Sequence, residues 1–321
     1  MPFELHVWGR IGDLQTFDTN CLIAEVYLKL TRPQLKDTYV IVPSSNPTLS
    51  STFELPCIRE GEEIVASGLF NVIRFLKVRG FDLDAELSAA NKAKNTALMT
   101  FIDCNFTVLS LYIQRLHIVH FQENFRPGVT KLVTFPLQYI IPMLLFNSAK
   151  RRIAHIHDID VTNKATDASS KAIVPGFSFI EKRKILYGDV SDSVPKTLVD
   201  KINEAAGGRA EFQALCKMLN LATESLPSIE DILAEGKSAF LFGDRPSTAD
   251  AFLLGHLAVE TQPKYFTPFL KDLISSNYPA LQSYMDKNIG IVKSSGEHTV
   301  GLVGPTDQLT FWSTSKWYLS S

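Results

Sequence analysis

Cysteine is scarce in this sequence of 321 residues, and its four cysteines lie far apart. Cys21, Cys57, Cys104 and Cys216 form no C-x-x-C pair and no dense framework. This spacing is typical of buried thiols in a reducing compartment, and it excludes a small secreted fold that depends on disulfides. A chain of this length buries enough surface to fold without disulfides or a structural metal.

An excess of charge of either sign is also lacking, because 32 basic residues are matched by 34 acidic residues. A general electrostatic footprint for nucleic acid would require a basic chain, so we expect no nucleic-acid partner. The amino terminus places Glu4 among alternating apolar residues, which fits neither a secretion signal nor an arginine-rich presequence. The sequence contains no internal repeat and no low-complexity tract.

Strand and helix patterns alternate in the first part of the chain. Phe3, Leu5 and Val7 repeat every second residue, which predicts a strand, and the apolar run 21–30 predicts a helix that ends before Pro33. The expected order is β-α-β-β-β-α, with the remaining strands at 38–42, up to residue 58 and at 64–66, and the second helix at 68–78.

From Asp84 onward the apolar period changes from two residues to about 3.6, which is typical of helices. We expect one long helix over 89–122, broken at Arg126-Pro127-Gly128. Further helices are expected at 194–221, 229–234, 249–260 and 265–288. These patterns predict an α+β thioredoxin-like domain at 1–82, an all-helical domain at 83–290, and a polar tail at 291–321 that ends in aromatic residues.

Two motifs make this order of elements more specific. Leu55-Pro56 precedes a predicted β-turn-β unit and resembles the cis-proline segment of thioredoxin-like domains. Ser247 and Asp250 have the S-x-x-D spacing of a capping box at a helix start. Pro56, Ser247 and Asp250 are therefore interpreted as structural residues, and the chain as a whole is similar to glutathione transferases in architecture.

Three segments resemble the metaxin branch of that superfamily: HVWGRIGDLQTFDTNCLIAEVYLKL, LPCIREGEEIVASGLFNVIRFL and Phe135-Pro136-Leu137. Within the metaxin family they resemble the larger metaxin-like subunit of the fungal mitochondrial sorting and assembly machinery. The resemblance implies a non-catalytic subunit on the cytosolic face of the mitochondrial outer membrane, which aids the insertion, folding and release of β-barrel proteins. The implied partners are an integral outer-membrane β-barrel protein and a second metaxin-like subunit, with a receptor of the outer-membrane import translocase as a further candidate.

Glutathione chemistry would need a hydroxyl or thiol after the first strand and a polar pair before the second helix. After the first strand, Trp8 stands where the hydroxyl or thiol would be needed. Thr19 and Cys21 could supply that group instead, although Cys21 falls inside an apolar run. At the second place, Ala66-Ser67 lacks the usual acid. We therefore expect neither an enzyme nor a cofactor. The alternatives are a divergent glutathione transferase that uses Thr19 and Ser67, and a glutathione-transferase-like scaffold in a cytosolic complex.

Two histidine patterns are candidate metal sites. His155, His157, Asp158 and Asp160 alternate with apolar residues, but a solvated strand or loop explains that pattern better. His117 and His120 share a helix face without a third ligand nearby in sequence. We expect no metal site.

The most apolar run extends from Leu132 to Ala149, with Lys131 before it. Pro136 and Pro142 each remove a helical hydrogen bond, so we expect a peripheral protein without a transmembrane helix and no other plausible span. The run is either a buried broken helix or a surface that contacts a membrane or an apolar partner. In the second case the candidate contacts are Phe135, Tyr139, Leu145, Lys150, Arg151 and Arg152.

The last residues of the chain are abruptly aromatic after a polar stretch. Trp312, Trp317 and Tyr318 would give a large contact area at low entropy cost, so they are also candidate contacts with a partner or a membrane. The equally favoured alternative is that this tail packs back on its own domain.

Overall fold

A computed structural model describes residues 3–9, 16–31, 39–157, 209–236, 238–261, 269–293 and 309–310. The first domain contains a four-stranded sheet with the order β2-β1-β3-β4. Strands β1 (Phe3–His6) and β2 (Tyr39–Val42) are parallel, while β3 (Cys57–Glu60) pairs antiparallel with both β1 and β4 (Glu63–Ser67). With helices α1 (Thr19–Thr31) and α2 (Leu69–Val78), this confirms the predicted order β-α-β-β-β-α.

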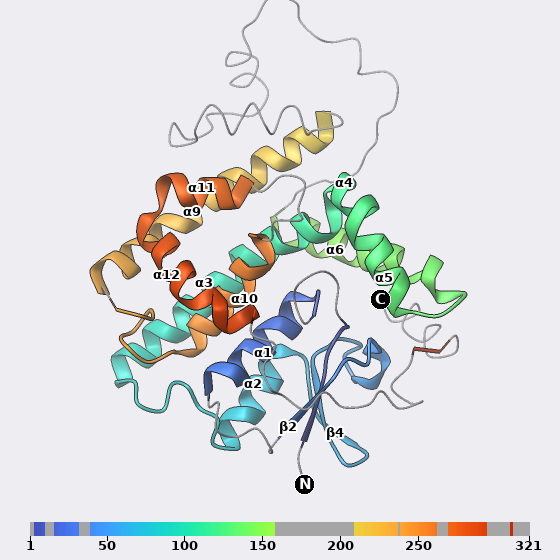
Figure 1. The fold of residues 1–321 in the computed structure, drawn as a ribbon, viewed down its shortest axis with the longest axis horizontal. Helices are drawn as coiled ribbons and strands as arrows, with labels where there is room; N and C mark the ends of the chain where they lie inside the picture. Colours follow the sequence, from blue (N-terminus) through green and yellow to red (C-terminus); the bar gives the residue numbers. More distant parts are fainter. Residues whose placement is uncertain are drawn as a thin grey trace, which may run out of the picture.

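Helices α1 and α2 lie between the sheet and the helical domain (Figure 1). The peptide bond between Leu55 and Pro56 is cis, as the resemblance to thioredoxin-like domains implied. The short 3₁₀ helix η1 (Pro47–Leu49) lies in the loop before this proline. A second cis bond, between Phe135 and Pro136, was not expected from the sequence.

The second domain is helical throughout its described part. Its elements are α3 (Ala89–Leu111), η2 (Tyr112–Leu116), α4 (Ile118–His120), η3 (Phe121–Phe125), α5 (Arg126–Leu132), η4 (Leu137–Tyr139), α6 (Ile141–His157), α9 (Arg209–Gly236), α10 (Thr248–Glu260), α11 (Phe269–Asn277) and α12 (Pro279–Lys293).

The first helix break of this domain was predicted at the wrong place. The helical path turns at His117, whose ψ of 113° is extended, and not at Arg126-Pro127-Gly128. Pro127 stands at the start of α5, where its missing N–H is tolerated because the first N–H groups of a helix have no intrahelical partner.

Two other expected boundaries were wrong as well. The segment 229–234 is the end of the single helix α9, which passes through Pro227 because Leu226 and Ile229 are fully buried on either side of it. The residues 194–208 of the expected preceding helix lie outside the described residues. The expected helix 265–288 is divided, because Pro279 starts α12 and disfavours a helical conformation at Tyr278.

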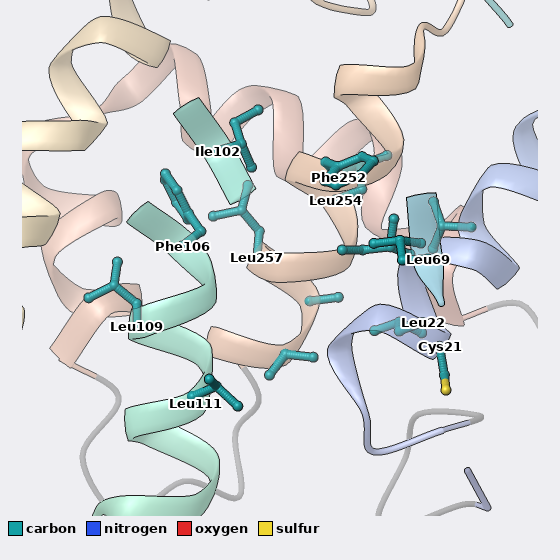
Figure 2. Close-up of a cluster of buried hydrophobic side chains, with 14 of the residues drawn as sticks. Cys21, Leu22, Leu69, Ile102, Phe106, Leu109, Leu111, Phe252, Leu254 and Leu257 are labelled. Carbon is teal, nitrogen blue, oxygen red and sulfur yellow. The ribbon is translucent and has the colours of Figure 1, made fainter. Parts of the chain in front are cut away.

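Helix α10 is the centre of the molecule, since every residue from Thr248 to Glu260 is buried. It packs mainly against α1 and α3, where apolar side chains from the first domain and from the helical domain meet (Figure 2). Gly255 permits the close crossing with α1, because a Cβ there would lie 2.5 Å from Cγ1 of Ile23.

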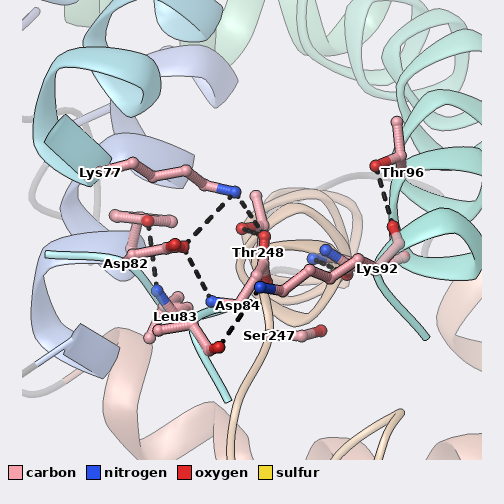
Figure 3. A network of polar contacts seen from close by, with 12 residues as sticks. Lys77, Asp82, Leu83, Asp84, Lys92, Thr96, Ser247 and Thr248 are labelled. Atoms are coloured by element: carbon pink, nitrogen blue, oxygen red, sulfur yellow. Dashed lines mark hydrogen bonds and ion pairs between the residues drawn. The ribbon is translucent and has the colours of Figure 1, made fainter. Parts of the chain in front are cut away.

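The start of α10 carries the capping box predicted at Ser247 and Asp250, with both reciprocal hydrogen bonds present. Asp84, from the segment that joins the two domains, also accepts hydrogen bonds from the Thr248 amide (2.9 Å) and hydroxyl (2.6 Å). Lys77 of α2 contacts the same Asp84 carboxylate (Figure 3). The helix start therefore joins the first domain, the linking segment and the helical core.

One described helical segment, Ala89–Leu116, is long and apolar enough to cross a membrane by length and composition alone. The expectation that no stretch besides 132–149 could qualify is therefore wrong. In this structure 56% of the most apolar window of the segment is buried inside the protein. Some of its polar residues are buried too, and one of them, Asn95, accepts a hydrogen bond from the Ala249 amide (3.1 Å).

Candidate functional site

The apolar run 132–149 has a buried side and an exposed side in the structure. Leu137, Ile141 and Leu144 point into the core. Four further apolar side chains are exposed, by 76% for Phe135, 61% for Tyr139, 38% for Ile140 and 43% for Met143. We refer to these four residues as the apolar ridge.

The segment that carries the apolar ridge is anchored by a buried residue. Leu137, at the start of η4, is only 2% exposed, and the Ile140 amide donates a hydrogen bond to the Leu137 carbonyl (2.9 Å). The rings of Phe135 and Tyr139 meet edge to face, with their centroids 6.3 Å apart. Aromatic rings in this arrangement gain contact energy beyond their area alone, so the ridge is a preformed surface.

Large exposed apolar side chains are otherwise dispersed in the described part of the chain. Val65 lies on β4, while Phe70 and Val78 lie at the two ends of α2. A contiguous apolar patch on a folded protein marks a contact with another protein or a membrane more often than single exposed residues do. The apolar ridge is therefore the candidate interaction surface, and it includes the predicted contacts Phe135 and Tyr139.

Leu145 does not belong to this surface, which corrects its selection as a contact. It is only 4% exposed, because it lies on the inner face of α6 beside Ser148 and Ala149 and lines a cavity there. The largely apolar sequence of the run did not indicate which face would be covered.

The three basic residues that follow the run do not lie on one surface. Lys150 lies three or four residues from Asn147 and Ala154, on the helical stripe that begins at Met143 of the apolar ridge. Arg151 and Arg152 are exposed but line the same cavity as Leu145. The trio is thus not a single basic patch, although the sequence presents it as one.

The predicted contacts Trp312, Trp317 and Tyr318 lie outside the described residues. Leu309, shortly before them, is 7% exposed and belongs to the hydrophobic core. The chain therefore contacts the folded body at Leu309.

The cavity has a volume of about 330 Å³ and lies between the two domains. We refer to it as the interdomain cleft. Its walls come from Trp8 after β1, the first residues of α1, the loop before Pro56, the later part of α3, Arg115 and the inner face of α6.

A buried ion pair crosses the base of the interdomain cleft. Arg115 donates to Asp18 at 2.7 Å, and its guanidinium lies over the ring of Phe125. Burial lowers the pKa of Arg115, while the carboxylate of Asp18 opposes this shift. Asp18 also accepts the Cys21 amide at 3.2 Å and so caps α1.

The residues weighed for glutathione chemistry are not assembled as a nucleophile site. Cys21 is completely buried, and burial together with the negative charge of Asp18 raises the pKa of its thiol well above the usual value. The ring of buried Trp8 packs against Phe17. Thr19 does line the interdomain cleft, whereas the described lining of this cleft does not include Ser67.

Sequence reasoning missed a serine, histidine and carboxylate cluster in the core. The Ser110 hydroxyl lies 2.9 Å from His256 Nδ1 and donates to Glu260 at 2.7 Å. Burial lowers the pKa of His256 to about 3 and raises the pKa of Glu260 well above its usual range. All three side chains are at most 1% exposed, so no substrate reaches them and the cluster is structural. The helical spacing of His256 and Glu260 in an apolar helix was the available signal.

No group of three or more metal-ligating side chains occurs within the described ranges. His117 and His120 are buried, and burial together with the neighbouring His117 lowers the pKa of His120 to about 3. The side chains of His155 and His157, with Asp158 and Asp160, lie outside the described part of the chain.

A thioredoxin-like domain with a cis-proline loop, followed by an all-helical domain, defines the glutathione-transferase-like architecture. A family model for the C-terminal domain of glutathione S-transferases matches residues 222–287. Among solved structures, a glutathione transferase of Phanerochaete chrysosporium covers 91% of this chain and 97% of its own, at 12% identity and a TM-score of 0.48. The β-etherase LigF of Sphingobium covers 89% and 94%, at 15% identity and a TM-score of 0.43.

A second family model, Tom37, described as an outer mitochondrial membrane transport complex protein, matches residues 21–145. Mouse metaxin-1 is 22% identical over 82% of this chain and 67% of its own length. Zebrafish metaxin-3 is 22% identical over 80% and 65%, and the fruit-fly metaxin-1 homolog is 25% identical over 79% and 62%. The chain is thus similar to the Tom37/metaxin family, and the matching Tom37 model describes an outer mitochondrial membrane transport complex protein.

Proposed function

We propose that this chain is a non-catalytic subunit of the mitochondrial sorting and assembly machinery, on the cytosolic face of the outer membrane. Its role is to aid the insertion, folding and release of β-barrel proteins by binding. Its partners are the membrane β-barrel subunit and a second metaxin-like subunit, with a receptor of the import translocase as a further partner. The similarity to the Tom37/metaxin family supports the location, and the apolar ridge is the observation that supports a binding role.

The apolar ridge suits the surface of an anionic bilayer. Aromatic side chains such as Phe135 and Tyr139 are favourable at the boundary between lipid and water. Lys131 on α5 and Lys150 on α6 lie close in sequence to the two ends of the ridge. Each basic residue near an anionic surface contributes about 1 kcal/mol to binding. We therefore propose peripheral contact with lipid through the ridge, with Lys131 and Lys150 as its basic flanks.

The contact is tested by vesicle flotation with the full chain, using phosphatidylcholine with and without phosphatidylinositol. Replacing Phe135 and Tyr139 by serine should weaken binding at least about tenfold, because burial of an aromatic side chain contributes about 1.5–3 kcal/mol. The matched control is Val78→Ser, which changes an 81% exposed apolar residue on α2 outside the ridge. Equal binding of both variants would remove the apolar ridge from the proposal.

The electrostatic contribution is tested with a variant in which the charges of Lys131 and Lys150 are reversed. Arg151 and Arg152 are left unchanged, because reversing them would also alter the interdomain cleft. The double change to glutamate should reduce binding to anionic vesicles and leave the weaker binding to neutral vesicles unchanged. Unchanged binding to anionic vesicles would contradict the electrostatic part of the proposal.

The assembly role is tested by affinity purification of the tagged chain from gently solubilised mitochondria. Stoichiometric recovery of an integral β-barrel protein is the expected result. Recovery of the chain alone, with retention on glutathione resin, would instead support a divergent glutathione transferase. A purely cytosolic distribution would support a scaffold in a cytosolic complex.

A further inference from the structure

The sheet of the first domain has an open edge at β4. In the order β2-β1-β3-β4, strand β4 has a described neighbour on its β3 side alone (Figure 1). No backbone hydrogen bond joins residues 63–66 to a described residue outside the β3–β4 ladder. At the opposite edge Tyr39 and Val42 of β2 are buried, whereas Glu63 and Val65 of β4 are exposed. Edge strands carry unpaired N–H and C=O groups that can pair with another chain.

A β-bulge adds to the unpaired groups of this edge. The register of the ladder passes from Ile58 opposite Ala66 to Arg59 opposite Ile64, so Val65 has no opposite residue in β3. The extra residue of a bulge stays unpaired in the ladder. Its side chain is also 37% exposed. Val65 therefore presents both backbone groups and an apolar side chain to a neighbouring strand.

The exposed end of β4 is acidic. Glu62 and Glu63 are both exposed, and Glu63 stands opposite Glu60 in the ladder. Glu60 is paired with Arg79 at 2.6 Å, but no described salt bridge gives Glu63 a cation. Like charges opposite each other destabilise a sheet and opposite charges stabilise it. A basic side chain beside Glu63 would therefore be favourable.

These features restrict what can pair with the edge. Charged side chains and bulges hinder pairing with an arbitrary apolar strand. A strand with basic side chains is favoured instead, because it forms cross-strand pairs of opposite charge. A second copy of the same edge does not supply them, since residues 62–67 contain two glutamates and no lysine or arginine.

We propose that the open edge of β4 binds an extended segment of another polypeptide as an added strand, with a basic side chain beside Glu63 and an apolar side chain beside Val65. In strand addition the backbone hydrogen bonds contribute affinity and alternate side chains contribute specificity. The preferred segment has its basic and apolar residues two positions apart, as Glu63 and Val65 are. The inference does not rest on the apolar ridge or on the assembly role, so its failure would leave the proposed function unaffected.

The test uses the full chain and the acetylated peptide Thr-Lys-Thr-Val-Thr-Lys-Thr, in which lysine lies two positions from valine in both chain directions. Binding is followed by amide hydrogen exchange, because an added strand forms hydrogen bonds with the edge amides. At saturation the peptide should slow exchange within residues 62–66 by at least about threefold. Unchanged exchange in this segment, or no saturable binding, would overturn the proposal.

Two altered peptides separate backbone pairing from charge. Methylation of the three central amides removes hydrogen-bond donors and keeps both lysines, and it should weaken binding at least about tenfold. Glutamate in place of both lysines should weaken binding to a similar extent, because attraction becomes repulsion. Equal affinity of the methylated peptide would reduce the contact to charge attraction and overturn strand addition. Equal affinity of the glutamate peptide would overturn the proposed selectivity.

A charge exchange assigns the site. The double change Glu62→Lys and Glu63→Lys should reverse the preference, so that the glutamate peptide binds more tightly than the lysine peptide. The matched control reverses Glu224 and Glu235, which are exposed on α9, and should bind the lysine peptide as the unaltered protein does. Equal loss of lysine-peptide binding in both variants would reduce the effect to net charge and overturn the assigned site. Dimerisation of the unaltered chain that the change at Glu62 and Glu63 abolishes would identify a second copy as the partner and also overturn the proposal.

Discussion

At the scale of single residues, Gly255 shows how closely the two domains meet. A Cβ at this position would lie 2.5 Å from Cγ1 and 3.2 Å from Cα of Ile23, and the backbone atom cannot move without shifting α1. We expect Gly255→Ala to lower the free energy of unfolding by roughly 1–3 kcal/mol, as is usual for an overpacked core. Denaturant unfolding measures this change.

Gly290 of α12 is the matched control, because no atom of the described residues beyond its own helix backbone lies within 4 Å of the Cβ that alanine would add there. Gly290→Ala should raise stability by about 0.5–1 kcal/mol, since alanine is the better helix former. Similar effects of the two substitutions would contradict the close crossing of α1 and α10.

Glu25 of α1 should make stability depend on pH. Its carboxylate is 1% exposed without a hydrogen-bond partner, and burial raises its pKa from 4.5 to about 7, against the attraction of Lys29. Because the folded-state pKa is the higher one, this residue's contribution is full below pH 4.5 and is lost as the pH rises to about 7. The lost contribution amounts to about 3 kcal/mol.

Glu25→Gln should remove this part of the pH dependence. The difference in unfolding free energy between the two proteins is measured from pH 4 to pH 8, so that the contributions of Asp250 and Glu260, whose pKa values burial also raises, cancel. A difference that stays constant over this range would show that Glu25 titrates normally.

At the scale of elements, the start of α10 depends on the carboxylate of Asp84, which lies far away in the sequence. Burial would raise the pKa of Asp84, but the hydrogen bonds from Lys77 and Thr248 outweigh it and hold that pKa below its ordinary value. Asp84→Asn should therefore cost about 2 kcal/mol near neutral pH. The cost should shrink as the pH falls from about 4 through the lowered pKa of Asp84 in the folded protein, because the carboxylate is then protonated in both states.

Glu86→Gln provides the control for this prediction, since Glu86 pairs with Arg245 where both side chains are more than two thirds exposed. A surface pair of this kind contributes little, so this variant should change stability by less than about 1 kcal/mol. Thermal unfolding at neutral and acidic pH compares the two, and equal losses would remove the special role of Asp84.

The same helix shows what the sequence can and cannot predict. The capping box of Ser247 and Asp250 was predictable, because both partners lie within one helical turn. The contributions of Asp84 and Asn95 were not, because their partners are far along the chain and leave no local pattern.

The apolar ridge was predicted only as part of the run 132–149. Packing against neighbouring helices decides which side of this run is covered, and the sequence does not contain that information.

At the scale of the whole molecule, the apolar segment Ala89–Leu116 has two conceivable environments, the protein core and a membrane. Cys104 lies on this segment and is exposed, whereas the other three cysteines are buried. In the fold described here, a membrane-impermeant maleimide should label one thiol of the native protein, at Cys104, both with and without vesicles. Protection of Cys104 by vesicles, with no labelling of Cys104→Ser in either condition, would place the segment in the bilayer.

Helix α6 carries Met143 of the apolar ridge on one side and lines the interdomain cleft with the other. An α-helix with its side chains is about 10–12 Å across, and this sets the separation of the two surfaces. A molecule held in the cleft would consequently lie roughly one helix diameter from whatever covers the ridge. Binding in the cleft and attachment at the ridge would thus both act on helix α6. A probe placed on either surface would therefore report on the other surface.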